Sequence, residues 1–231
     1  MGQPHTDSAS TADAATDSVD LPPETKHQDT LLGGARTLKP RNLGILLLVT
    51  GTIGWLSAFA LTLDKLKLLE DPDAKLGCDF NPFFSCGSVM TYPQSAVFGF
   101  PNPLIGVAAF VVPIVIGVAL IGGVRLPRWI WLGLNAGVFL GAVFITWLFV
   151  QSIFVIGVGC PWCIVVWAMQ IPMFVMLTLH NVVAGNFGAA VQKNSALRTL
   201  AGSPWSIVVL WYAIIAASIV AAFWPWFSSL I

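Results

Sequence analysis

Five long apolar stretches without Asp, Glu, Lys or Arg constrain the fold of this chain more than any other feature. They are residues 43–63, 103–124, 129–159, 161–183 and 205–227. About 20 apolar residues in a helix are enough to cross a bilayer. Only 10% of the residues are charged and the mean hydropathy is +0.81, which excludes an ordinary soluble domain. We therefore predict an all-α, polytopic membrane protein with five transmembrane helices, with a re-entrant loop in 129–159.

The basic residues gather in the connections on one side of these helices. Lys26, Arg36, Lys39 and Arg41 precede the first helix, Arg125 and Arg128 follow the second, and Lys193 and Arg198 follow the fourth. This side holds eight of the eleven Lys and Arg residues, and the positive-inside rule assigns it to the cytoplasm. We expect a multi-pass protein of the inner or plasma membrane with a cytoplasmic N-terminus. The 64–101 loop, the 150–160 turn and the C-terminus then lie outside the cytoplasm.

Residues 1–41 differ in composition from the rest of the chain. They are rich in Ser, Thr, Ala, Asp and Pro and cannot bury a core, so we predict a disordered cytoplasmic tail. Residues 42–231 are the predicted five-helix transmembrane domain, with residues 64–101 as its external loop. Residues 57–60, "SAFA", resemble a signal-peptidase site. The first helix is needed to orient the others, so we expect no cleavage.

All four cysteines fall outside the cytoplasm in this topology. Cys78 and Cys86 lie in the external loop, and Cys160 and Cys163 form a C-x-x-C pair at the external start of the fourth helix. That compartment permits disulfides, and two local pairs with no cysteine left over indicate two dithiol/disulfide couples. Unpaired N–H groups and the positive end of the helix dipole stabilise a thiolate at Cys160. Cys163, one turn deeper, faces the hydrocarbon edge and can meet a lipid-soluble molecule.

Other uses of the same cysteines stay open. Two structural disulfides would occupy the same positions, so a membrane transporter or structural protein with two static disulfides is the alternative. A zinc site is disfavoured because seven residues separate Cys78 from Cys86 and no His lies near either pair, so we expect no metal. His180 is interpreted as a helix-end residue. The sequence has no basic patch for nucleic acid, and we expect no such partner.

A small-residue stripe, Gly133, Gly137 and Gly141, runs along the third predicted helix. Small residues at this spacing allow two membrane helices to approach closely. We expect close packing inside the bundle, with dimerisation as the alternative.

Three motifs in order along the chain resemble one known family. The loop "CDFNPFFSCGSVMTYPQSAVFGFPNPLIGV" runs from Cys78 to Val107, and "CPWC" follows at a later helix start. Together, Cys-x7-Cys-Gly-Ser-Val, Phe-Gly-x-Pro-Asn and C-x-x-C resemble the bacterial homologues of vitamin K epoxide reductase. The resemblance covers residues 43–183, and the fifth helix is compatible with bacterial members.

The resemblance implies a four-helix bundle around a quinone, with a fifth helix alongside. It implies a membrane thiol:quinone oxidoreductase that supports disulfide-bond formation. Electrons would pass from a thioredoxin-like protein to the loop pair, then to the helix pair, then to a membrane quinone, menaquinone or ubiquinone. By the same resemblance, Cys78 would face the partner protein and Cys86 would exchange with Cys160. Cys163 would lie next to the quinone ring.

One position matches the family and two depart from it. Asn102 in "FPNP" matches the family asparagine that hydrogen-bonds a quinone carbonyl, although a helix N-cap before Pro103 is an equally good interpretation. Tyr92, beside Thr91, stands where a small hydroxyl residue is common. Trp167 stands where many members have Tyr, and it can still line a quinone pocket by stacking. These departures favour quinone reduction over epoxide reduction.

Many bacterial members of this family continue into a fused thioredoxin-like domain. This sequence ends at Ile231, directly after the fifth apolar stretch. We therefore expect the thioredoxin-like partner to be a separate protein of the periplasm or cell envelope.

Overall fold

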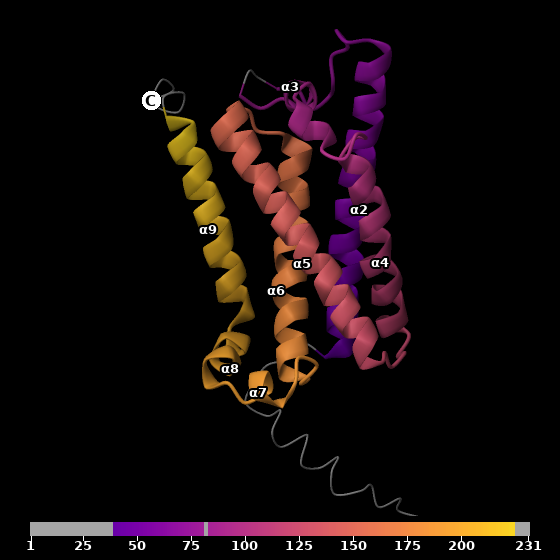
Figure 1. The fold of residues 1–231 in the computed structure, drawn as a ribbon, viewed down its shortest axis with the longest axis vertical. Helices are drawn as coiled ribbons and strands as arrows, with labels where there is room; N and C mark the ends of the chain where they lie inside the picture. The colour runs from indigo at the N-terminus through magenta and orange to yellow at the C-terminus, as the bar shows by residue number, and fades with distance from the viewer. Residues whose placement is uncertain (1–38, 81–82, 225–231) are drawn as a thin grey trace, which may run out of the picture. The chain divides into compact units, whose positions relative to one another are not determined.

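The computed structural model describes residues 39–80 and 83–224 of the 231-residue chain. Its five long helices are α2 (Pro40–Glu70), α4 (Pro103–Ile121), α5 (Arg128–Val150), α6 (Pro161–Val183) and α9 (Pro204–Ala222) (Figure 1). Each is long and apolar enough to cross a membrane, α5 together with the π-helical turn η2 (Gln151–Ile156) that extends it. The prediction of an all-α polytopic membrane protein is confirmed.

The shorter helices lie in the connections. They are α3 (Cys86–Met90), the 3₁₀ helix η1 (Pro93–Ala96), α7 (Ala189–Gln192) and α8 (Ser195–Gly202). Figure 1 shows α3 at one end of the long helices and α7 and α8 at the other. Most of the predicted 1–41 tail lies outside the described residues, and α2 begins at Pro40.

Proline sets the start of four of the five long helices. Pro40, Pro103, Pro161 and Pro204 are each the first residue of a helix. At this position the missing N–H costs no hydrogen bond and the fixed φ suits the helix. α5 begins directly after Pro127. Because these signals are local, the predicted starts at 103, 129, 161 and 205 agree with the observed starts within one residue.

α2 and α4 pack backbone to backbone through glycines. A Cβ added to Gly44 would lie 2.9 Å from the Gly117 carbonyl oxygen, and one added to Gly117 would lie 2.7 Å from that of Gly44. Small residues allow membrane helices to approach this closely. α6 contacts α2, α5 and α9, so α2, α4, α5 and α6 form the four-helix bundle and α9 lies against α6 (Figure 1).

The glycine stripe on α5 does not make the close helix contact that the sequence suggests. A Cβ added to Gly133 or Gly137 would have no atom within 4 Å, whereas one added to Gly141 would lie 2.9 Å from the side-chain nitrogen of Gln170. All three glycines line a partly open cavity between the helices. The packing prediction is wrong for Gly133 and Gly137, because their missing side chains widen this cavity instead of admitting a neighbouring helix.

Candidate redox site

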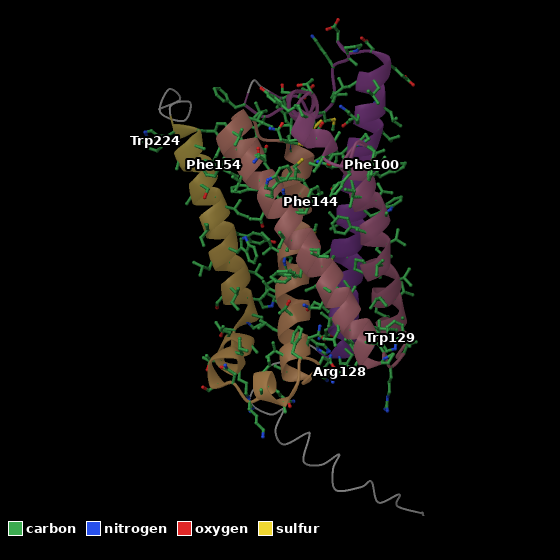
Figure 2. The ribbon with its side chains drawn as sticks, in the orientation of Figure 1. Phe100, Arg128, Trp129, Phe144, Phe154 and Trp224 are labelled. Carbon is green, nitrogen blue, oxygen red and sulfur yellow. A yellow bond between two sulfur atoms is a disulfide. The ribbon has the colours of Figure 1, made fainter. Side chains whose placement is uncertain are left out.

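The four cysteines meet at the end of the bundle that carries α3, where Figure 2 shows the sulfur atoms in yellow. Cys78 and Cys86 form a disulfide, whereas Cys160 and Cys163 are free thiols. The Sγ atoms of Cys86 and Cys160 lie 3.3 Å apart although 74 positions separate them in sequence. The structure therefore joins both pairs in one site, which holds one disulfide and one dithiol.

An isolated backbone bridge holds the two pairs in register. The Ser85 N–H donates to the Gly159 carbonyl at 3.0 Å, and the Gly159 N–H donates to the Phe83 carbonyl at 2.7 Å. Ser85 and Gly159 directly precede Cys86 and Cys160 in sequence. The bridge therefore positions the two touching sulfurs.

Gly159 is a positioning residue that was not predicted from the sequence. A Cβ added here would lie 3.0 Å from ring carbons of Phe84, so a larger residue would push the bridged segments apart. The sequence signal is a glycine directly before the C-x-x-C pair. With 21 glycines in the chain, this signal does not stand out.

Both touching sulfurs lie at helix N-termini. Cys86 is the first residue of α3, whose N-cap Ser85 accepts a hydrogen bond from the Ser88 N–H at 3.0 Å. Cys160 is the N-cap of α6, and its Sγ accepts from the Cys163 N–H at 3.4 Å. The sequence-based placement of Cys160 at a helix start is confirmed. Such starts stabilise negative charge on sulfur.

The surroundings of Cys160 lower the pKa of its thiol. A hydrogen bond with the Cys163 side chain contributes most, and the backbone N–H groups of Cys163 and Trp162 add to it. Burial and the Asp64 carboxylate act in the opposite direction. A sulfur with a lowered pKa leaves more readily in thiol–disulfide exchange, so Cys160 suits the role of leaving group.

A cavity of 420 Å³ adjoins the cysteines. Cys86, Cys160, Cys163, Asn102 and Trp167 all contribute to its wall. The remaining wall is mainly aliphatic and aromatic, and small-molecule sites commonly have volumes of about 300–1,000 Å³. The site therefore connects thiols to an apolar cavity within the helices.

Asn102 occupies the N-cap position of α4, but its side chain does not cap that helix. Instead Nδ2 donates to the Gln94 carbonyl at 2.7 Å, and Oδ1 accepts from the Val97 N–H at 3.1 Å. The N-cap interpretation holds for the position and not for the side chain, because the preceding loop folds over the amide. Asn102 is 7% exposed, and its second Nδ2 proton has no partner among the described residues. The two hydrogen bonds therefore fix the orientation of an amide that belongs to the cavity wall.

In a comparison with known protein families, the model of the Vitamin K epoxide reductase family matches residues 45–179. This range is more than half of the chain and contains every cysteine. The chain belongs to the Vitamin K epoxide reductase family. No curated protein matches it. Family membership makes the chain a multi-pass membrane oxidoreductase of thiols and quinones, and it confirms the resemblance in the sequence.

The two departures from the Vitamin K epoxide reductase family pattern lie in different places. Trp167 is 4% exposed, packs edge-on against Phe149 with ring centroids 5.0 Å apart, and lines the cavity. Tyr92 is 42% exposed and is not among the residues of the cavity wall. The Thr91 hydroxyl donates to the Ser88 carbonyl at 2.8 Å. Of the two departures, only Trp167 is placed to touch a bound molecule.

Several polar residues of the cavity wall were not predicted from the sequence. They are Gln94, Ser95, Gln151, Ser152 and Gln170. Gln94 has a buried Oε1 with no hydrogen-bond partner in the described part of the chain. Gln170 donates to the Val138 carbonyl at 2.8 Å and so ties α6 to α5. These residues come from three separate elements, and no local pattern marks them as neighbours.

Cys78 is only 4% exposed, although the family resemblance directs it toward a partner protein. Leu61 and Leu76 are buried in the same cluster as its side chain. A partner thiolate can therefore reach the Cys78 sulfur only after the groups that cover it have moved.

Asp79 braces the loop pair. Its Oδ1 accepts from the Ser85 hydroxyl at 2.7 Å and from the Gly87 N–H at 3.0 Å, and its Oδ2 accepts from the Leu76 N–H at 3.3 Å. Burial acts to raise the pKa of Asp79, but these donors together hold that pKa below its ordinary value. Because Ser85 and Gly87 flank Cys86, the carboxylate fixes the backbone on both sides of that cysteine.

Asp79→Asn is expected to destabilise the folded protein by about 1 kcal/mol at neutral pH, a small effect because solvent screens this exposed carboxylate. A carboxyl with a lowered pKa in the folded state contributes stability above its unfolded pKa. That contribution is lost as the pH falls through the folded value. The difference between wild type and variant should therefore shrink below about pH 4.

Thermal unfolding in detergent across this pH range measures the effect of Asp79→Asn. Asp73→Asn, at an exposed carboxylate of the same loop, is the matched control. Equal destabilisation by both substitutions, or a difference that persists in acid, would contradict the bracing role.

The described residues, 39–80 and 83–224, contain no group of three His, Cys, Asp or Glu side chains arranged to hold a metal ion. The His180 ring lies against Trp131 with centroids 4.7 Å apart. His180 therefore takes part in packing between α5 and α6.

Proposed function

We propose that this protein passes electrons from a thioredoxin-like dithiol protein outside the cytoplasm to a membrane quinone. The path runs through the Cys78–Cys86 pair and then the Cys160–Cys163 pair, and it supplies oxidising equivalents for disulfide-bond formation. The observation that carries the proposal is the 3.3 Å separation of the Cys86 and Cys160 sulfurs. Sulfurs in contact can exchange disulfide bonds without a large movement of the chain.

The charge distribution supports an extracytoplasmic position for the cysteines. Arg128, at the start of α5, lies at the end of the bundle opposite the sulfur atoms (Figure 2). Arg125 precedes it in the same short connection. The positive-inside rule places such an end in the cytoplasm. The protein would then lie in the inner or plasma membrane with its N-terminal side in the cytoplasm.

Thiol–disulfide exchange accounts for both transfers between sulfurs. A partner thiolate attacks Cys78, and Cys86 leaves. The second thiolate of the partner then attacks the partner sulfur that is bonded to Cys78, and Cys78 leaves. The freed Cys86 attacks Cys160 of the oxidised helix pair, and Cys163 leaves as a thiolate. Each exchange forms one S–S bond and breaks one, so electrons pass toward the helix pair without a further oxidant.

The cavity fits a quinone. A bound quinone, menaquinone or ubiquinone, supplies an acceptor for two electrons and two protons. Cys163 lines the cavity, which supports its assignment as the sulfur that releases electrons there. The free N–H of Asn102 would polarise a carbonyl oxygen in a site with little water. Trp167 adds a flat apolar surface to the wall, on which a ring can stack.

The first test follows quinone absorbance with the purified protein in detergent. A reduced thioredoxin-like periplasmic protein is the electron donor, and ubiquinone-1 or menadione is the acceptor. We expect quinone absorbance to fall with time. Removal of any one of the four cysteines should stop this loss, because each exchange requires its own sulfur.

The same assay separates the proposal from the static-disulfide alternative. Redox-active pairs are reduced by a mild dithiol and reoxidised by quinone, whereas structural disulfides resist such reduction. No turnover with either quinone, together with cysteine pairs that stay oxidised in mild dithiol, would show that the cysteines only staple the fold.

A further inference from the structure

A carboxylate lies beside the loop disulfide. Asp64 is in the last two turns of α2, and its Oδ2 lies 3.5 Å from the Sγ of Cys78. Its side chain is half-buried. Lys65, the next residue, donates to the Met90 carbonyl at 2.7 Å. When the disulfide is reduced, the Cys78 thiol can therefore donate its proton to Asp64.

The charges that face Asp64 come from three elements. Lys67 on α2 attracts its negative charge, and Asp79 on the loop repels it. The carboxylate is also close enough to Cys160, at the start of α6, to oppose ionisation of that thiol. Asp64 therefore interacts with a sulfur of each pair, with Cys78 by direct approach and with Cys160 through charge.

We propose that Asp64 accepts the proton of Cys78 when oxidising equivalents pass from the helix pair to the loop pair, an inference that rests on the function proposed above. Before this step, Cys86 is bonded to Cys160 in a mixed disulfide. The Cys78 sulfur attacks the Cys86 sulfur, and its proton passes to Asp64. The Cys86–Cys160 bond breaks, and Cys160 leaves as a thiolate that takes up this proton.

The electrons balance within the protein. The two loop thiols become a disulfide, and the helix pair, which began as a disulfide, becomes two thiols. The structure has the arrangement that follows this step. The Cys78–Cys86 bond is formed, Cys160 is free at 3.3 Å from Cys86, and the carboxylate stays beside Cys78.

Asp64 could act on the attack by Cys78 either as a proton acceptor or only as a negative charge, and these two roles change the rate of the attack in opposite directions. A thiol is a weak nucleophile near neutral pH because little of it is ionised, and a base within reach raises the reactive fraction. A carboxylate that acted only through its charge would disfavour the Cys78 thiolate and slow the attack. Asp64→Asn should therefore make the exchange faster if Asp64 acts only through its charge, and slower if Asp64 acts as the base.

The test follows oxidation of the fully reduced, full-length protein in detergent by excess ubiquinone-1 or menadione. Samples are quenched in acid at set times, and the thiols of each pair are counted by mass-tag alkylation. Asp64→Asn should slow formation of the Cys78–Cys86 disulfide at least about tenfold near pH 6.5. The difference should disappear above about pH 9, where the thiol ionises without a base.

Two further variants complete the test. Asp64→Glu should restore most of the rate, because it keeps the carboxylate. Asp73→Asn, at an exposed carboxylate of the loop that carries Cys78, should match wild type. Oxidation of the Cys160–Cys163 pair should still proceed in Asp64→Asn and so report that the variant is folded. If Asp64→Asn does not fold, the test rests on Asp64→Glu. A tenfold slower formation of the Cys78–Cys86 disulfide in that folded variant would overturn the proposal.

The remaining outcomes are also distinct. An unchanged or faster loop oxidation in Asp64→Asn, or a slower one that is independent of pH, would overturn the role of Asp64. Failure of both quinones to oxidise the Cys160–Cys163 pair in the wild type would overturn the proposed function itself, and this inference with it.

Discussion

Cys163→Ala is expected to reduce quinone-dependent turnover by at least about a thousandfold, as removal of a reacting nucleophile commonly does. Cys163 lines the cavity, and Cys160 is only 1% exposed and touches the loop pair through Cys86. Cys160, the other free thiol, lies against the loop sulfur of Cys86 and so does not replace Cys163. The variant should be measured by quinone absorbance with the thioredoxin-like donor and, separately, with a membrane-permeant dithiol.

The loop pair supplies the internal control for Cys163→Ala. Cys78 and Cys86 keep their sulfurs, so their exchange with the partner protein should continue and can be trapped as a mixed disulfide. Loss of both activities would indicate misfolding. Quinone reduction at the wild-type rate in Cys163→Ala would contradict the assignment of Cys163 as the sulfur next to the quinone.

Cys86→Ala is expected to separate the two halves of the relay. Partner-driven quinone reduction should fall by at least about a thousandfold, because Cys86 is the loop sulfur in contact with Cys160. A membrane-permeant dithiol reduces the helix pair directly, so turnover driven by that dithiol should persist. Comparing the two donors on the same preparation measures the effect of the missing link alone.

The two variants should differ in which activities they keep. Cys163→Ala should stop quinone reduction with either donor and spare exchange at the loop, whereas Cys86→Ala should stop partner-driven turnover alone. Wild-type turnover of Cys86→Ala with the partner would show that Cys78 exchanges with the helix pair directly. In that case the proposed order of sulfurs would be wrong.

The helices of this protein could be predicted from local signals. Apolar runs without charge, and prolines at Pro103 and Pro161, act over a single segment and need no knowledge of the rest of the chain. The same holds for Cys160, whose helix start follows from the adjacent proline. The glycine stripe was misjudged because packing depends on the facing helix, and α5 faces a cavity at Gly133 and Gly137.

The candidate site could be predicted only in part. Cysteine spacing and the family motif indicated a loop and a helix start that the structure brings together. They also indicated Asn102 and Trp167, which line one cavity with Cys163. The hydrogen bonds that orient Asn102 were not predictable, because they depend on how the 93–102 segment folds back over the amide. Asp64 belongs to no sequence motif, and only its short distance to the Cys78 sulfur in the structure indicates a role in the site.

The sequence by itself determined the membrane class, the number of spanning helices and the presence of two cysteine pairs, because hydropathy and spacing are properties of contiguous residues. Only the tertiary structure decided that the pairs touch. The Cys86–Cys160 contact joins residues 74 positions apart and depends on a two-hydrogen-bond bridge through Gly159. Such a contact has no local pattern, because it forms only when packed helices bring the external loop over the start of α6.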